Sequence, residues 1–291
     1  MQSLVAQIIN GLATGSIYAL LVLGMNLLVL VRDIVHHGYS HIVMITMAIG
    51  WLVLNMTGNN ILITILIMFV VGIVATMATE PLFRPLCKRG ATLETIVLAM
   101  GVGIICTEIM SQFINNGGNF AYPENIRGGG LSITVGLIHF SFANILTLII
   151  AITVAIFLMW FMYKTQTGRS IRAMSQNLRV AKMLGIPFGK TGMIGFGIAG
   201  ALATVIALMI IMTIGTNGPS VGDTFAVKAI ILMLFAGMGN LKGGLLSALF
   251  MGLVEALALA YLPGSWTEVI FYGVIMGVII WRPNGLFGTS R

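Results

Sequence analysis

Long apolar runs separated by short polar loops dominate the 291-residue sequence. A helix that crosses the roughly 30 Å hydrocarbon core of a bilayer needs about 20 apolar residues. The apolar runs lie near Leu4–Val31, Ile42–Asn55, Ile61–Thr79, Leu93–Ile114, Ala143–Tyr163, Gly192–Ile214, Ala226–Gly239, Gly243–Leu262 and Trp266–Trp281. This pattern predicts an all-α fold, a polytopic transmembrane helical bundle with about eight or nine membrane segments.

Two of these runs, near 42–55 and 226–239, are shorter than a full crossing. Irregular backbone survives at membrane depth only where protein or a wet cavity surrounds it, so short runs are typical of broken or re-entrant segments. We expect the helices at these two places to be short or broken.

The composition excludes a water-soluble protein. Hydrophobic residues make up 58% of the chain and charged residues 8%, whereas soluble domains carry roughly a quarter charged residues. The apolar runs leave no room for a soluble catalytic domain. We therefore expect residues 1–291 to form a single transmembrane domain embedded in the lipid bilayer, with a cytoplasmic segment at 164–190.

The net charge of +7 gives the orientation rather than a nucleic-acid partner, because the basic residues sit in short loops between apolar runs. The segment 164–190 holds six of them and no acid. Placing it in the cytoplasm puts thirteen of the fifteen basic residues inside and leaves only Arg127 and Lys228 outside. This predicts an outer N-terminus, a cytoplasmic C-terminus and an outer stretch, 115–140, suited to docking an extracytoplasmic partner.

Two glycine motifs imitate nucleotide sites. Gly195–Gly200 matches G-x-G-x-x-G but lies inside an apolar run, where close helix packing is the better interpretation. Gly185–Thr191 resembles a phosphate-binding loop, yet three residues rather than four separate its glycines. There is also no nucleophile with an identifiable base. We expect no cofactor and no catalysis by this chain.

Histidines cluster after the first run, where His36, His37 and His41 have only Asp33 nearby. Metal sites normally recruit ligands from more than one local segment, so we interpret this group as a polar patch at the inner end of the first helix and predict no metal. Cys87 and Cys106 are expected to be unpaired thiols.

Four polar residues fall at membrane depth: Asn26, Glu108, Gln112 and Glu255. Burying such groups costs several kcal/mol without a partner or water, so they are expected to face the bundle interior. Each either forms an interhelical hydrogen bond, with carboxyls protonated, or contacts a solute.

The cytoplasmic segment 170–186 is amphipathic. Its apolar stripe comprises Ile171, Met174, Leu178 and Ala181, whereas Arg172, Arg179 and Lys182 share another face. Gly185 and Pro187 then end the helix. Such a helix either rests on lipid or docks its stripe into a groove on a soluble partner.

These residues together resemble the LivH-like permeases of branched-chain amino-acid ABC importers, over nearly the whole chain. The matching pieces are Asn10–Leu12, Gly15–Leu20, Arg84–Leu86, Arg172 with Ala173, Asn177, Gly185, Gly237–Asn240, Gly243, Gly252, Glu255, Arg282 with Pro283, and Gly285–Gly288. One departure is Ile34–Gly38, which keeps only the final His-Gly of the usual Asn-Phe-Ala-His-Gly.

The resemblance implies a permease in the bacterial inner membrane that works with cytoplasmic ATPase subunits, a second permease or a copy of itself, and a periplasmic solute-binding protein. It places the solute path near the divergent region that holds His37. The polar residues at membrane depth, Asn26, Glu108, Gln112 and Glu255, are further candidates for this path or for interhelical contacts. Coupling to the ATPase falls to Ile171, Arg172, Ala173, Met174, Asn177, Leu178, Ala181 and Gly185. The alternatives are an ABC permease for an amide, urea or sugar, a secondary transporter or channel, and a scaffold without transport.

Overall fold

The computed structural model describes residues 4–89, 91–124, 126, 132–135 and 138–288. The helices are α1 (Leu4–Arg32), α2 (Tyr39–Met56), α3 (Ile61–Arg89), α4 (Thr92–Phe113), α5 (Phe142–Lys164), α6 (Gln166–Gln176), α7 (Leu178–Met183), α8 (Phe188–Thr213), α9 (Val221–Ala236), α10 (Leu241–Tyr261) and α11 (Gly264–Trp281). A 3-10 turn, η1 (Asn115–Gly117), and four short strands complete the described elements: β1 (Phe120–Ala121), β2 (Ser132–Val135), β3 (Ile138–Ser141) and β4 (Thr216–Asn217).

Eight of the described helices are long and apolar enough to cross a membrane, which confirms the predicted polytopic helical bundle. α2 is short, at 18 residues, but unbroken, and it belongs to the eight. α9 has 16 residues and does not. The predicted short segment near 226–239 is therefore α9, which ends at Ala236.

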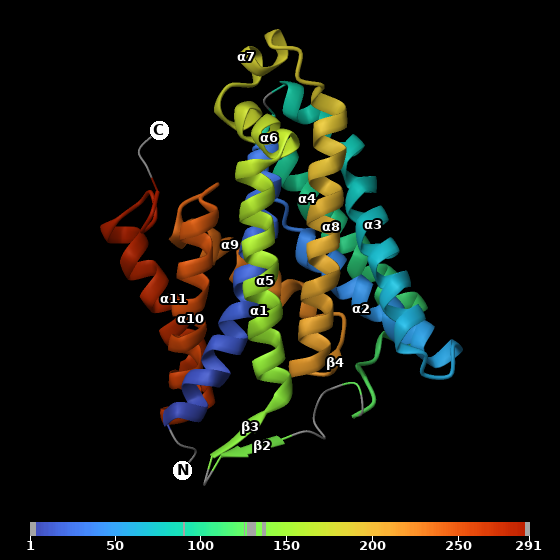
Figure 1. Cartoon of the computed structure of the whole chain (residues 1–291), viewed down its shortest axis with the longest axis vertical. Coiled ribbons are helices and arrows are strands. Elements are labelled where there is room, and N and C mark those ends of the chain that lie inside the picture. The colour runs from blue at the N-terminus through green and yellow to red at the C-terminus, as the bar shows by residue number, and fades with distance from the viewer. Residues whose placement is uncertain (1–3, 90, 125, 127–131, 136–137, 289–291) are drawn as a thin grey trace.

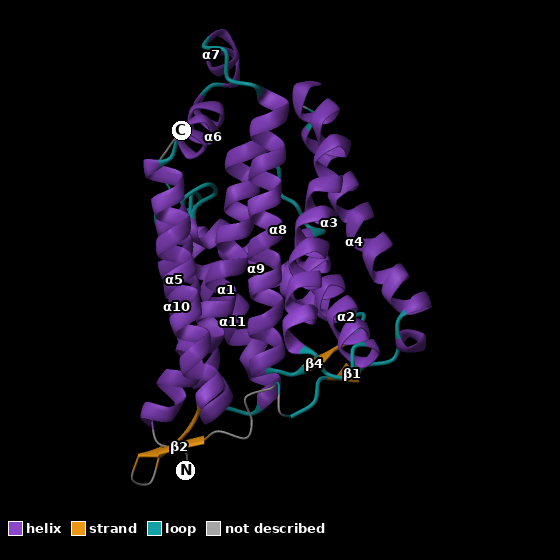
Figure 2. Ribbon diagram, turned by 45° about the vertical axis from the view of Figure 1, so that its right-hand side comes forward, coloured by secondary structure: helices purple, strands orange, loops and turns teal. Residues whose placement is uncertain are grey.

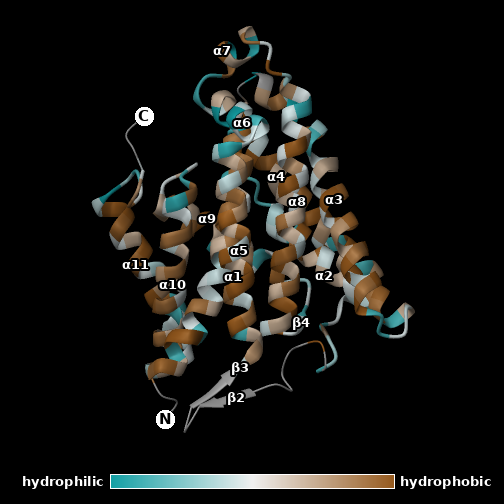
Figure 3. Ribbon diagram, in the orientation of Figure 1, coloured by the Kyte–Doolittle hydropathy of each residue, from teal (hydrophilic) through white to brown (hydrophobic). Residues whose placement is uncertain are grey.

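α1 runs through the centre of the bundle, and 89% of its apolar window is buried. The corresponding share is 67% for α2 and α8, but only 22% for α3 and 17% for α11, which lie at opposite edges of the bundle in Figure 1, and 28% for α4, which lies at the outer edge in Figure 2. Large apolar side chains such as Leu62, Leu93 and Ile280 are exposed there. Figure 3 shows hydrophobic residues along the outer helices and hydrophilic residues near α6 and α7. The exposed apolar belt is the surface expected to meet lipid.

Glycines bring the central helices close together. An added Cβ at Gly15 would lie 2.9 Å from the Cα of Leu249, where α1 meets α10. One at Gly200 would lie 2.7 Å from the Cα of Ile73, where α8 meets α3. Gly200 closes the G-x-G-x-x-G motif, so this motif serves helix packing, as its apolar context indicates.

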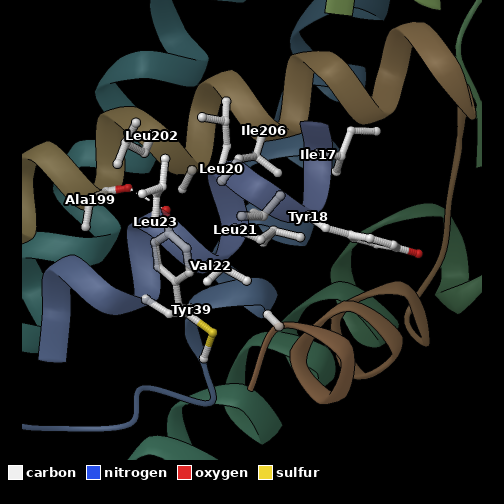
Figure 4. Close-up of a cluster of buried hydrophobic side chains, with 14 of the residues drawn as sticks. Ile17, Tyr18, Leu20, Leu21, Val22, Leu23, Tyr39, Ala199, Leu202 and Ile206 are labelled. Carbon is white, nitrogen blue, oxygen red and sulfur yellow. Dashed lines mark hydrogen bonds between the residues drawn. The ribbon is translucent and has the colours of Figure 1, made fainter. Parts of the chain in front are cut away.

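The core joins α1, α2 and α8, as Figure 4 shows with Leu20, Leu23 and Ile206. The ring of Tyr39, at the start of α2, packs against Gly24 of α1, where a side chain would collide with it. Its hydroxyl donates a hydrogen bond of 2.9 Å to the carbonyl oxygen of Ala199 on α8. The start of α2 is therefore fixed to both neighbours.

The two ends of the bundle differ. α6 and α7 lie at one end, and the N-terminal end of the chain, β2 and β3 lie at the other (Figure 1). β1 pairs antiparallel with β4, and β2 with β3. On the strand side, Tyr122 donates a hydrogen bond of 2.5 Å to the Met47 carbonyl, and the Asn217 side chain donates one of 3.0 Å to that of Met44. Burial raises the pKa of Tyr122, so its hydroxyl stays a donor.

Candidate functional site in the membrane

The connection between α1 and α2, a break in the helical backbone, leads from the end of α1 into the bundle, so that α2 begins at half its depth. Asp33 adopts a positive φ of 57° after α1 ends, and Gly38 precedes α2. Gly103 lies beside this break: a Cβ added there would be 3.1 Å from the His41 ring and 3.5 Å from that of His37. Because Gly103 is at the middle of α4 (Thr92–Phe113), the break lies far from both ends of a helix long enough to span a membrane.

Three polar side chains meet at this break. His41 is 1% exposed, and its Nε2 lies 2.9 Å from Oδ1 of Asp223, in the first turn of α9. The His37 and His41 ring centroids are 5.3 Å apart. A ligand-type atom from each of the three residues lies within 4.8 Å of those from the other two. Gly222 permits the contact, since a Cβ there would lie 2.7 Å from the His41 ring.

Asp223 is the unusual member, because its side chain is 63% exposed. A carboxylate at this depth is costly against hydrocarbon, and intramembrane acids almost always face a bundle interior or a water-filled cavity. The face formed by α2, α4 and α9 therefore borders water or another polypeptide rather than lipid. His37 was expected near the solute path, whereas Asp223 and the partner role of His41 were missed. The only signal for Asp223 was an acid just before a short apolar run.

The other expected path residues lie elsewhere. Asn26 is fully buried and accepts a hydrogen bond of 2.8 Å from the backbone N–H of Gly239, so it fixes α1 to the turn before α10. Glu108 and Gln112 are exposed on α4 and share a hydrogen bond of 2.7 Å. The structure thus gathers none of these three with His37.

Glu255 has a partner that sequence reasoning missed. Lys228 was counted among the basic residues outside, and the structure buries it within α9, 8% exposed, where it pairs with Glu255 of α10 at 2.5 Å. It also donates a hydrogen bond of 2.9 Å to the Tyr18 hydroxyl on α1. The charge count considers basic residues in loops. It does not detect a lysine inside the bundle whose acidic partner comes near only when the chain folds. Arg127, the other basic residue expected outside, lies outside the described residues.

A second buried ion pair lies at the C-terminal end of α1. The Arg32 guanidinium pairs with Glu80 of α3, and both side chains are fully buried. Glu80 also pairs with Arg84 at 2.5 Å. Arg32 donates a hydrogen bond of 3.1 Å to the Phe188 carbonyl and stacks on the Phe188 ring at 3.6 Å. Sequence reasoning did not single out Glu80, although an acid at the end of an apolar run was a visible signal.

The segment 170–186 folds as two helices rather than one. The Thr165 hydroxyl caps α6 by accepting from the N–H of Gly168, and α6 ends at Gln176. The Asn177 side chain then caps α7 by accepting from the N–H groups of Arg179 and Val180. Gly185 follows with a φ of +77°, as expected for a glycine that ends a helix.

The predicted apolar stripe faces the chain itself. Ile171 is fully buried in the main core, and Met174 and Ala181 pack with Phe188 and Leu178. Arg172 donates a hydrogen bond of 3.1 Å to the Met162 carbonyl, and Ala173 is half-buried. The stripe therefore does not form a free docking face. The exposed apolar residues are instead Val180, Met183 and Leu184, at 48%, 82% and 74%.

Phe188 connects this segment to the break in the membrane. Its ring packs against Met174 and Ala181 on one side and carries the Arg32 guanidinium on the other. Arg32 is the last residue of α1, directly before the connection that leads to His37. A single aromatic ring thus contacts both the α6–α7 segment and the last residue of α1.

A polar cavity of about 500 Å³ lies beside α6. Asp33, Tyr163, Arg172, Asn240 and Asn284 contribute to its lining. The glycine-rich segments near 237–243 and 282–288 meet at this place, since the backbone N–H of Leu286 donates to the Phe235 carbonyl at 2.8 Å and the Asn240 side chain to that of Phe287 at 2.8 Å. Two segments that are far apart in the sequence thus lie side by side at this cavity.

Eight potential spans, polar residues at half-depth and a packed amphipathic segment at one end define a multi-pass membrane protein of the transport type. Residues 7–279 match the family described as "Branched-chain amino acid transport system / permease component", and the chain belongs to that family.

Several known proteins are similar to this chain in amino-acid sequence. The chain is 25% identical to the high-affinity branched-chain amino acid transport system permease protein BraD of Pseudomonas aeruginosa, over 98% of this chain and 96% of BraD. It is also 25% identical to the corresponding LivH of Escherichia coli, with the same coverage. A relative with a different named substrate is the fructose import permease protein FruG of Bifidobacterium longum. It is 25% identical over 82% of this chain and 72% of FruG.

Proposed function

We propose that this chain is the membrane-spanning permease subunit of an ATP-binding-cassette importer for branched-chain or related amino acids. The observation that carries the proposal is its end-to-end similarity to the permeases BraD and LivH. The chain pairs with a second permease or with a copy of itself, receives its solute from a periplasmic binding protein, and leaves ATP hydrolysis to separate cytoplasmic subunits. Its location is the bacterial inner membrane.

The proposed orientation places α6, α7 and the C-terminal end in the cytoplasm and the N-terminus outside. Its support is the basic segment 164–190, which carries no acid, and the separation of the N-terminal end from α6 and α7 along the bundle (Figure 1). Lys242 agrees, since its ammonium lies 5.7 Å from the ring centroid of Tyr163, at the end of α5 that leads into α6.

In this proposal the solute passes along the face formed by α2, α4 and α9. Asp223 and His37 contact it there, because an exposed carboxylate at half-depth is favoured only beside a water-filled path. The partner permease encloses the path from the other side. Glu108 and Gln112, exposed near the outer end of α4, line the same face at its entrance.

Coupling is assigned to α6 and α7. The exposed apolar tip, Val180, Met183 and Leu184, meets the ATPase subunit, while the inward stripe of Ile171, Met174 and Ala181 makes the segment rigid. Asn177 and Gly185 set the two ends of α7. A rigid contact of this kind passes ATPase closure to Phe188 and Arg32, and from there to the break before α2.

Uptake into vesicles tests the proposal. The assembled importer, with its ATPase, binding protein and partner permease, is reconstituted with ATP on the ATPase side, and labelled leucine, isoleucine and valine are supplied with the binding protein. ATP-dependent accumulation is expected. Uptake driven by an ion gradient without ATPase subunits would instead identify a secondary transporter, and absence of uptake of every solute would identify a scaffold.

The similarity to FruG favours one second candidate, import of a sugar. The two differ in the charge of the solute, because an amino acid carries an ammonium group that suits Asp223, whereas a neutral sugar offers only hydroxyls. The same vesicles are therefore assayed with labelled fructose in competition with leucine. Fructose uptake unaffected by excess leucine would replace the amino-acid assignment and keep the importer.

A further inference from the structure

The cluster at the α1–α2 break has the donor set of a transition-metal site. His37 and His41 offer two imidazole nitrogens and Asp223 one carboxylate oxygen, from two segments far apart in sequence. Imidazole with carboxylate suits Zn²⁺, Ni²⁺ and Cu²⁺. Asp33, the acid that sequence proximity suggested, is not among the three.

One of the two imidazoles is buried, and only one of its nitrogens has a partner among the described residues. His41 is 1% exposed, and although its Nε2 contacts Asp223, its Nδ1 has no hydrogen-bond partner among the described residues. A buried polar nitrogen without a partner is destabilising, typically by about 1–3 kcal/mol. With the ring proton on Nδ1, Nε2 offers a lone pair that can ligate an ion.

The surroundings hold the His41 ring in place. The His41 ring lies against Gly103 of α4 and Gly222 of α9, and a side chain at either position would press into it. Metal–ligand distances near 2.0–2.2 Å bring tetrahedral ligand atoms to roughly 3.3 Å from one another. Present separations reach 4.8 Å, and the exposed Asp223 and half-buried His37 are the side chains free to move inward.

Charge also favours a cation. Asp223 is exposed at half-depth, and among the described residues the lysine of its own helix, Lys228, is already paired with Glu255. A divalent ion held between the two imidazoles and this carboxylate supplies positive charge next to it.

We infer that His37, His41 and Asp223 bind one divalent transition-metal ion, such as Zn²⁺, on the face of α2, α4 and α9. The ion keeps open coordination positions, since three protein ligands leave at least one for water or solute. If this face is the solute path, as in the proposed function, the bound ion obstructs it, and Zn²⁺ inhibits uptake. Binding itself does not depend on that role.

Metal titration of the purified full-length chain tests the inference apart from transport. The chain is purified with a tag free of histidine, stripped with a chelator and titrated with Zn²⁺ against a chromophoric competitor, and with Co²⁺ by visible absorption. The comparison includes His41→Gln and Asp223→Asn, with His139→Gln as the matched control, because His139 lies on β3, away from the cluster.

Equimolar, saturable binding is expected in the unmodified chain and in His139→Gln, with affinity at least about tenfold weaker in both cluster variants. Because Asp223 is exposed, Asp223→Asn is expected to keep the fold even if His41→Gln does not, as monodispersity and melting temperature will record. Unchanged affinity in Asp223→Asn, or no saturable binding in the unmodified chain, would overturn the site. Transport of leucine by a chain that binds no Zn²⁺ would leave the importer intact and remove only the metal.

Discussion

Acids inside this bundle occupy two kinds of environment. Glu80 and Glu255 are enclosed, and each has a cation: Arg32 with Arg84 for the first, Lys228 for the second. Asp223 is exposed, and its described partner is an imidazole. Enclosed charges that lie beside an opposite charge tie helices together, whereas an open charge at membrane depth needs water, an ion or a solute. The comparison separates residues that hold the fold from residues available for transport.

Removing one partner of a buried ion pair should have the largest effect on stability. Glu80→Leu leaves the Arg32 guanidinium buried without its carboxylate, and breaking such a pair typically costs about 3–5 kcal/mol. We expect a fall of this size in the free energy of unfolding, measured by denaturation in detergent. The double variant Arg32→Met with Glu80→Leu should regain most of it, because no unpaired charge remains. Equal stability of the single and double variants would remove the pair from the account.

Tyr18→Phe tests the other enclosed pair with a smaller change. It removes the hydroxyl that accepts from Lys228, and hydrogen bonds to charged groups contribute about 1.5–3 kcal/mol. The free energy of unfolding should fall by that amount while Lys228 and Glu255 stay paired. Tyr272→Phe, on α11 and not bonded to Lys228, is the control. A loss of the same size in both would trace the effect to removal of a tyrosine hydroxyl in general rather than to its hydrogen bond with Lys228.

Asp223→Asn should show the opposite behaviour. We expect solute uptake to fall by at least about tenfold, equivalent to about 1.4 kcal/mol in the barrier, with melting temperature nearly unchanged because the side chain is exposed. Uptake by reconstituted vesicles and a thermal scan are measured on one preparation. Glu94→Gln, an exposed acid in the first turn of α4, should transport normally. A destabilised Asp223→Asn with normal uptake per folded molecule would assign Asp223 to structure.

Asn177→Ala should have the smallest effect. It removes the cap of α7, for which about 1 kcal/mol is typical, and the loss is confined to a six-residue helix. We expect faster amide exchange in α7 and a partial loss of ATPase association, with the membrane helices unaffected. Asn177→Asp retains a capping oxygen and should restore both. Failure of the Asn177→Asp variant to restore protection would show that the side chain acts on the partner and not as a cap.

The membrane helices were predictable because their signal is local. About 20 apolar residues in a row suffice to indicate a span, and even the short α9 was expected from its run. The end of α7 was predictable for the same reason, since Gly185 follows an amphipathic period directly. Such features need no knowledge of what lies across the bundle.

Pairing across helices was not predictable. Lys228 was counted only as a basic residue on the outer side, because Glu255 and Tyr18 come together with it only in the folded bundle. The stripe of Ile171, Met174 and Ala181 was visible as a period, but the period does not say whether its apolar face meets a partner or the chain itself. His37 was expected near the path from resemblance, whereas Asp223 needed the contact between α2 and α9.

The central claim is that the face carrying Asp223 borders water and not lipid. In a chain with Cys87 and Cys106 replaced, Asp223→Cys is compared with Val74→Cys, which lies at the middle of α3, outside the face of α2, α4 and α9, and is exposed to a similar extent, 58% against 63%. A charged, membrane-impermeant thiol reagent is applied to the assembled importer. We predict that the cysteine at 223 reacts at least about tenfold faster, because thiolates form in water and not in hydrocarbon, and that transported solute slows it. Equal, slow reaction at both positions would contradict the claim.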